Sequence, residues 1–102
     1  YSNKSKTTLL GVNTSLIREH GAVSAEVAKA MAEGGLAASN ADICISITGI
    51  AGPDGGSSDK PVGTVYMGVA TKNETQSHHF FFPVSRSLFQ TRAAYKALSL
   101  LL

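Results

Sequence analysis

A glycine-rich stretch over residues 48–64 carries the residue types in this chain that best suit ligand binding. Within it, fifteen residues contain five glycines and two prolines, so neither a helix nor a strand is expected there: Gly49, Gly52, Gly55, Gly56 and Gly63, with Pro53 and Pro61. Glycines let backbone N–H groups approach an anionic or polar ligand, and prolines reduce the entropy lost on binding. Lys60 adds a mobile cation, and Thr48 and Thr64 place hydroxyls at the two ends. Composition alone leaves two interpretations open, a ligand site or a flexible surface loop, and neither the P-loop nor the dinucleotide spacing occurs.

Other ligand classes are not indicated. His78 and His79 are neighbours in a predicted strand and would point to opposite faces, so they cannot bind one ion. His20 stands alone, and no cysteine or acidic cluster has ligand spacing, so we expect no metal. A formal charge of +2 with scattered Lys and Arg argues against nucleic acid as a partner. No apolar run approaches the roughly 18 residues of a membrane span, so we expect no membrane association.

The glycine-rich stretch resembles the signature of the CinA C-terminal domain family, the nicotinamide-nucleotide amidases. The resemblance lies in Thr-Gly-Ile-Ala-Gly-Pro-Asp-Gly-Gly at 48–56, followed by Lys-Pro-Val-Gly-Thr-Val at 60–65. Three further pieces fit in order: Tyr-Ser-Asn-x-x-Lys with Leu-Leu-Gly-Val within 1–12, His-Gly-Ala-Val-Ser at 20–24, and an arginine-bearing terminal helix. The similarity extends over essentially the whole chain.

This resemblance implies hydrolysis of nicotinamide mononucleotide to nicotinic acid mononucleotide and ammonia, by serine–lysine chemistry without a cofactor. Lys6 is implied as the general base, and Tyr1 as a proton relay or orienting hydroxyl. The alternative interpretation is a solvated helix lysine and a packing aromatic. The family's nucleophilic serine lies in an Ala-Glu-Ser-Cys-Thr-Gly-Gly segment that these 102 residues do not contain, so we expect them to be inactive by themselves.

The resemblance also implies a set of substrate-binding residues: Thr48, Gly49, Ile50, Ala51, Gly52, Pro53 and Arg86. Backbone N–H groups there would hold either the phosphate of the nucleotide or the oxyanion of the tetrahedral intermediate. Where the family commonly has a second arginine one turn after Arg86, this chain has Gln90, and Arg92 lies roughly half a turn off that face. A non-catalytic nucleotide-binding or assembly domain is therefore the second hypothesis.

Hydrophobic periodicity and caps predict the elements that position these residues. We expect helices over 2–10, 14–20 and 24–38, a strand over 42–48, a hairpin of strands over 63–71 and 75–82, and a last helix capped by Ser85. The 63–71 strand is expected to be central and the 75–82 strand nearer an edge. The last helix is expected to face the core with Leu88, Tyr95, Leu98 and Leu102.

These elements predict one domain over 1–102, an α/β/α sandwich with a mixed sheet. The chain begins inside a motif, and the family it resembles has one or more further strands and a helix before that point, so we expect an N-terminally incomplete copy. An unpaired sheet edge makes a homo-oligomer plausible. A single cysteine, Cys44, forms no internal disulfide and suits a reducing compartment, so we expect a cytoplasmic location.

Overall fold

The structure, a computed structural model, describes residues 12–52 and 55–100. In chain order its elements are α2 (Thr14–His20), α3 (Ala25–Ser39), β1 (Ile43–Gly49), β2 (Thr64–Thr71), β3 (Thr75–Phe81) and α4 (Arg86–Ser99). Their bounds agree within about one residue with the helices and strands predicted from residue 14 onward. The helix predicted over 2–10 lies outside the described residues.

The three described strands form one sheet in the order β1-β2-β3. Both pairs are antiparallel, with Ile47 opposite Met67 and Met67 opposite His78. The central place of β2, the edge place of β3 and the hairpin between them were all predicted. The mixed character was not observed within the described strands, because every pair formed among them is antiparallel.

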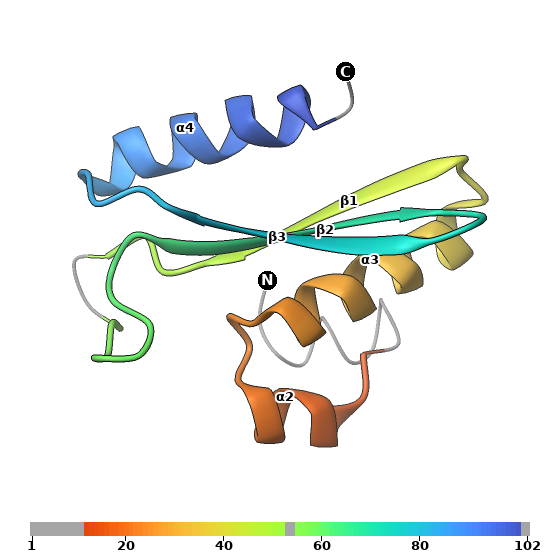
Figure 1. The fold of residues 1–102 in the computed structure, drawn as a ribbon, viewed down its shortest axis with the longest axis horizontal. Coiled ribbons are helices and arrows are strands. Elements are labelled where there is room, and N and C mark those ends of the chain that lie inside the picture. The colour runs from red at the N-terminus through yellow and green to blue at the C-terminus, as the bar shows by residue number, and fades with distance from the viewer. Residues whose placement is uncertain (1–11, 53–54, 101–102) are drawn as a thin grey trace.

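Helices cover both faces of this sheet, which confirms the sandwich architecture (Figure 1). Helix α4 lies on one face, where Val65 and Met67 of β2 pack with Phe89 and Ala93 of α4. Helix α3 lies on the opposite face, and α2 packs on the outer side of α3. A second core, between α2 and α3, is formed by Val12, Ile17, Val27 and Met31.

Close contact between α3 and β2 depends on a glycine. A Cβ atom added to Gly68 would collide with the carbonyl oxygen of Ala28, so a larger residue would force the helix away from the sheet. Ser46 of β1 fills the same junction, because its hydroxyl donates to the Ala28 carbonyl and accepts from the Gly68 amide. The buried face of β1 is therefore its polar face, which carries Ser46 and Thr48.

The predicted inward face of α4 was wrong. Leu88, Tyr95 and Leu98 are 52%, 70% and 59% exposed, whereas Phe89 and Ala93 are buried. The α4 sequence contains two apolar stripes, and the one that packs on the sheet combines the large Phe89 with the small Ala93 against Val65 and Met67. Leu102 lies outside the described residues.

Candidate functional site

The glycine loop, defined here as residues 50–63, is closed at its base by an extension of the β1–β2 ladder. The Ile50 amide donates to the Thr64 carbonyl at 2.9 Å, and the Gly63 amide donates to the Ile50 carbonyl at 2.7 Å. The Ile50 amide is therefore already used within the protein. Among the described residues, no hydrogen-bond acceptor is found for the next two amides, of Ala51 and Gly52.

Two glycines let the loop fold back on itself. Gly52 has a φ of +80°, a conformation that favours glycine, and an added Cβ would collide with Cγ1 of Val62. At Gly56 an added Cβ would lie 2.7 Å from the Val62 amide nitrogen. Val62 is thus the residue around which the two halves of the loop close.

Arg86 joins the loop to α4. As the first residue of that helix, it donates from Nη1 to the Gly52 carbonyl at 3.2 Å. The structure therefore places two of the predicted binding residues, Arg86 and Gly52, in direct contact. A guanidinium has five N–H donors in a planar fork, so Arg86 retains donors for an anion beside the loop.

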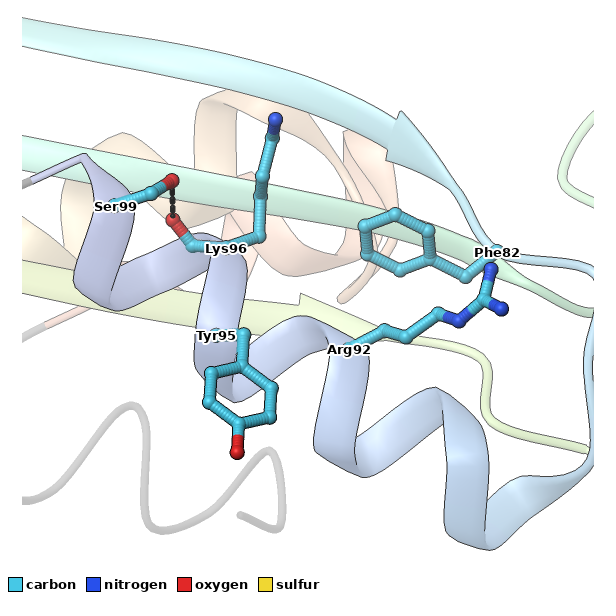
Figure 2. Close-up of a pocket in the computed structure, with 5 residues that line it drawn as sticks. All are labelled: Phe82, Arg92, Tyr95, Lys96 and Ser99. Carbon is cyan, nitrogen blue, oxygen red and sulfur yellow. Dashed lines mark hydrogen bonds between the residues drawn. The ribbon is translucent and has the colours of Figure 1, made fainter.

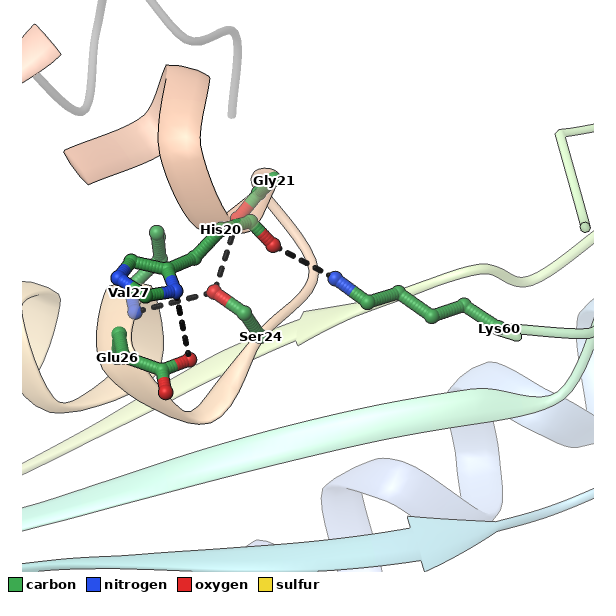
Figure 3. Close-up of polar contacts among 6 residues, drawn as sticks. All are labelled: His20, Gly21, Ser24, Glu26, Val27 and Lys60. Atoms are coloured by element: carbon green, nitrogen blue, oxygen red, sulfur yellow. Dashed lines mark hydrogen bonds and ion pairs between the residues drawn. The ribbon is translucent and has the colours of Figure 1, made fainter. Parts of the chain in front are cut away.

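Lys60 joins the other side of the loop to α2. Its Nζ donates to the carbonyl oxygen of His20 at 2.7 Å (Figure 3). Sequence reasoning treated Lys60 as a mobile cation and did not predict this contact. Both residues belong to motifs noted in the sequence, Lys60 to Lys-Pro-Val-Gly-Thr-Val and His20 to His-Gly-Ala-Val-Ser. A sequence pattern does not show, however, that two separate motifs are in contact.

The other predicted binding residues have structural contacts of their own. Thr48 is buried and donates from Oγ1 to the Ala22 carbonyl at 2.9 Å, which ties β1 to the turn before α3. Gly49 lies under α4, where an added Cβ would be 2.9 Å from Cζ of Phe89. Ile50 and Ala51 are half-buried at the start of the loop. Tyr1, Lys6 and Pro53 lie outside the described residues.

Three hollows on the described surface lie away from the glycine loop. One of about 320 Å³ is lined by Phe82, Arg92, Tyr95, Lys96 and Ser99 (Figure 2). A second, of about 390 Å³, lies along α4 and includes Gln90, Tyr95 and Leu98. The third, of about 430 Å³, lies at the β2–β3 turn and is mainly polar. Gln90, which stands where the family commonly has a second arginine, therefore lines the second of these hollows, on α4.

The histidine pair of β3 has the geometry that its spacing predicted. His79 stacks on Tyr66 with ring centroids 4.5 Å apart, while His78 lies beside Phe80 with centroids 6.3 Å apart. Within residues 12–52 and 55–100, no three His, Cys, Asp or Glu side chains gather as a metal site would require. In the same part of the chain, no helix is long and apolar enough to cross a bilayer.

Comparison with known proteins identifies the family. The model of the CinA C-terminal domain matches residues 1–102, the whole chain. This chain belongs to the CinA C-terminal domain family. It is 48% identical over 101 residues to a putative competence-damage inducible protein of Caldicellulosiruptor bescii. It is 51% identical over 102 residues to a CinA-like protein of Leptospira borgpetersenii.

Solved CinA-family structures share the fold described above. The competence/damage inducible protein of Agrobacterium tumefaciens matches with a TM-score of 0.94 at 37% identity, over 99% of this chain and 62% of that one. A CinA superfamily protein of Escherichia coli matches with a TM-score of 0.94 at 31% identity, over 99% of this chain and 59% of that one. The matches to the two curated relatives cover 99% of this chain but only 25% and 24% of those proteins. The chain thus corresponds to part of the CinA-family proteins it matches.

Proposed function

We propose that the protein containing this domain hydrolyses the carboxamide of nicotinamide mononucleotide, giving nicotinic acid mononucleotide and ammonia. A serine outside these 102 residues attacks the carboxamide carbon, and Lys6 accepts the serine proton. The carbon–nitrogen bond then breaks, and ammonia leaves with a proton returned by the lysine ammonium. Water hydrolyses the resulting ester, which releases the carboxylic acid and restores the serine. Tyr1 orients the lysine or relays its proton.

The observation that carries this proposal is the glycine loop of a CinA-family domain, with two adjacent amides at its start that have no acceptor among the described residues. The N–H groups of Ala51 and Gly52 are adjacent, and among the described residues neither donates a backbone hydrogen bond. Paired backbone donors of this kind stabilise the oxyanion that forms when a nucleophile adds to an amide. We assign these amides to the oxyanion, with Thr48, Gly49, Ile50 and Pro53 shaping the surrounding wall.

Arg86 supplies the positive charge for the substrate phosphate in this proposal. Arg86 is an exposed residue, and because its guanidinium donates to the Gly52 carbonyl, it lies next to the proposed oxyanion donors. A cation in that place binds a nucleotide monophosphate and holds the loop at the same time. The proposed site needs no metal or organic cofactor and acts on a free nucleotide, within the cytoplasm.

Replacing Lys6 tests the proposed chemistry. In the full-length protein, Lys6→Ala should reduce ammonia release from nicotinamide mononucleotide by at least about a hundredfold, since general-base catalysis contributes that much. Affinity for the nucleotide, measured by calorimetry, should stay within about twofold. Lys4→Ala, two residues away, is the matched control and should retain activity. Equal turnover in Lys6→Ala and the control would remove Lys6 from the mechanism.

A non-catalytic nucleotide-binding or assembly domain is the second candidate, and Gln90 is the observation that favours it. A neutral amide one turn after Arg86 leaves the described start of α4 with a single cation beside the loop. The two candidates separate in one experiment on the full-length protein. Calorimetric binding of nicotinamide mononucleotide without any ammonia release would support the binding domain.

A further inference from the structure

Lys60 connects the glycine loop to the end of α2. Its Nζ donates to the carbonyl of His20, the last residue of that helix, at 2.7 Å (Figure 3). The last carbonyls of a helix have no partner within the helix, and a cation near them is favourable. The lysine therefore satisfies an acceptor that α2 leaves open.

The turn that receives Lys60 is built independently of the loop. Gly21 follows His20 with a φ of +82° and donates its amide to the Ile17 carbonyl at 2.8 Å. Ser24 donates its hydroxyl to the Gly21 carbonyl at 2.8 Å and accepts from the Val27 amide, so the turn is fixed to the start of α3. A Cβ atom at Gly21 would lie 3.2 Å from the lysine Nζ, which shows how closely the side chain approaches.

On the loop side, Lys60 belongs to a small hydrogen-bonded turn. Its amide donates to Oγ of Ser57 at 3.1 Å, and the Ser57 amide donates to the Lys60 carbonyl at 3.0 Å. Holding the Lys60 side chain therefore also holds residues 57–60. On the opposite side of the loop, Arg86 holds the Gly52 carbonyl. The glycine loop thus has two cationic anchors: Lys60 of the loop donates to a carbonyl of α2, and Arg86 of α4 donates to a carbonyl of the loop.

We propose that Lys60 is a positioning residue that fixes the glycine loop against the α2–α3 turn and makes no contact with the ligand. Its consequence for turnover rests on the proposed function, since that function assigns the substrate to the loop. Loosening this anchor lets residues 57–60 move, while the hydrogen bond from Gly63 to Ile50 still closes the base of the loop. The ordered conformation then has to be restored each time substrate binds, which lowers kcat/KM.

Hydrogen–deuterium exchange of the full-length protein tests the anchor without reference to activity. Lys60→Met should speed exchange in the peptide covering 55–63 by about tenfold or more, the effect expected from losing a charge-assisted hydrogen bond. Lys60→Arg keeps a cation that reaches the carbonyl, so exchange should return to within about twofold of wild type. Lys72→Met removes an exposed lysine in the β2–β3 turn and should change nothing in this peptide.

The outcomes distinguish the anchor from the amidase. Unchanged exchange of residues 55–63 in Lys60→Met would overturn the proposal. Unchanged exchange combined with a tenfold loss of affinity for nicotinamide mononucleotide would also overturn it, by making Lys60 a ligand. Faster exchange with a matching fall in kcat/KM, both rescued by Lys60→Arg, supports it. Faster exchange in a protein whose wild type releases no ammonia supports the anchor and rejects only the amidase.

Discussion

Ser46 shows how one polar side chain determines the distance between a helix and the sheet. It is buried at the α3–β1–β2 junction, where its hydroxyl bridges the Ala28 carbonyl and the Gly68 amide. Both partners are backbone groups, so neither can turn toward water if the hydroxyl is lost. The bridge therefore stabilises one spacing of α3 above β2, the spacing that the absence of a Cβ at Gly68 permits.

Removing this hydroxyl should destabilise the fold. We expect Ser46→Ala to lower the free energy of unfolding by about 1 to 3 kcal/mol, because a buried donor is left without its partner. Urea titration followed by circular dichroism measures the change. Ser87→Ala, at an exposed position on α4, is the control and should stay within about 0.5 kcal/mol of wild type. Equal stability of the two variants would show that the bridge contributes nothing.

Gly52 carries both a conformational and a steric requirement. In the full-length protein, Gly52→Val should weaken binding of nicotinamide mononucleotide by tenfold or more, because its φ of +80° disfavours a side chain and Val62 occupies the space. Isothermal titration calorimetry gives the affinity. Gly55→Ala shares a positive φ, but its Cβ would only touch Ile50 at 3.8 Å, so a smaller loss is expected. Undiminished affinity in Gly52→Val would exclude the loop as the binding site.

Among the elements, α3 contains two adjacent helical glycines, Gly34 and Gly35. Gly35 is half-buried in the last third of α3. Glycine costs backbone entropy in a helix relative to alanine. The α3 helix is therefore less stable than its packing against β1 and β2 alone would allow.

Alanine at this position should stabilise the protein. We expect Gly35→Ala to raise the free energy of unfolding by about 0.5 to 1 kcal/mol, with no change in the glycine loop. Thermal unfolding detects the gain as a higher Tm. The contrasting variant is Gly68→Ala, where Ala28 blocks the added carbon, and it should lose stability. A loss of stability in Gly35→Ala would show that α3 has a close neighbour at this position.

The molecule as a whole keeps an apolar surface on the α4 side of the sheet. Ile43 and Ile47 of β1 are 41% and 36% exposed, and Leu88 and Leu98 of α4 are exposed as well. Among the described strands, β1 also has one edge without a partner, since β2 pairs only its other edge. Exposed apolar strand edges favour pairing with another chain. We propose that the 102-residue chain associates with a second copy through β1.

A lysine on this edge should prevent that association. We expect Ile43→Lys to shift the 102-residue chain from dimer to monomer in analytical ultracentrifugation, because a charge at a strand edge opposes pairing. Gln76→Lys, at an exposed position on the other outer strand, β3, is the control. A monomeric wild-type chain would contradict the prediction, as would a dimer that both lysine variants leave intact.

The identity and order of the elements from residue 14 onward followed from local rules in the sequence. Asn13 and Ser24 cap α2 and α3 as helix-capping chemistry predicts, and Gly21 ends α2 with a positive φ. The long CinA-type motif likewise indicates the family by itself, because its residues are nearly contiguous in the chain. These features depend on residues close in the chain, which is why the sequence alone determined them.

Tertiary structure alone decided which surfaces meet. It packed the Phe89–Ala93 face of α4 on the sheet and left Leu88, Tyr95 and Leu98 exposed, because Phe89 and Ala93 together fill the space over Val65 and Met67. It buried the polar face of β1 through Ser46, and it bonded Lys60 to His20, forty residues away. Contacts at such separation depend on how whole elements pack, and no local pattern of residues contains that information.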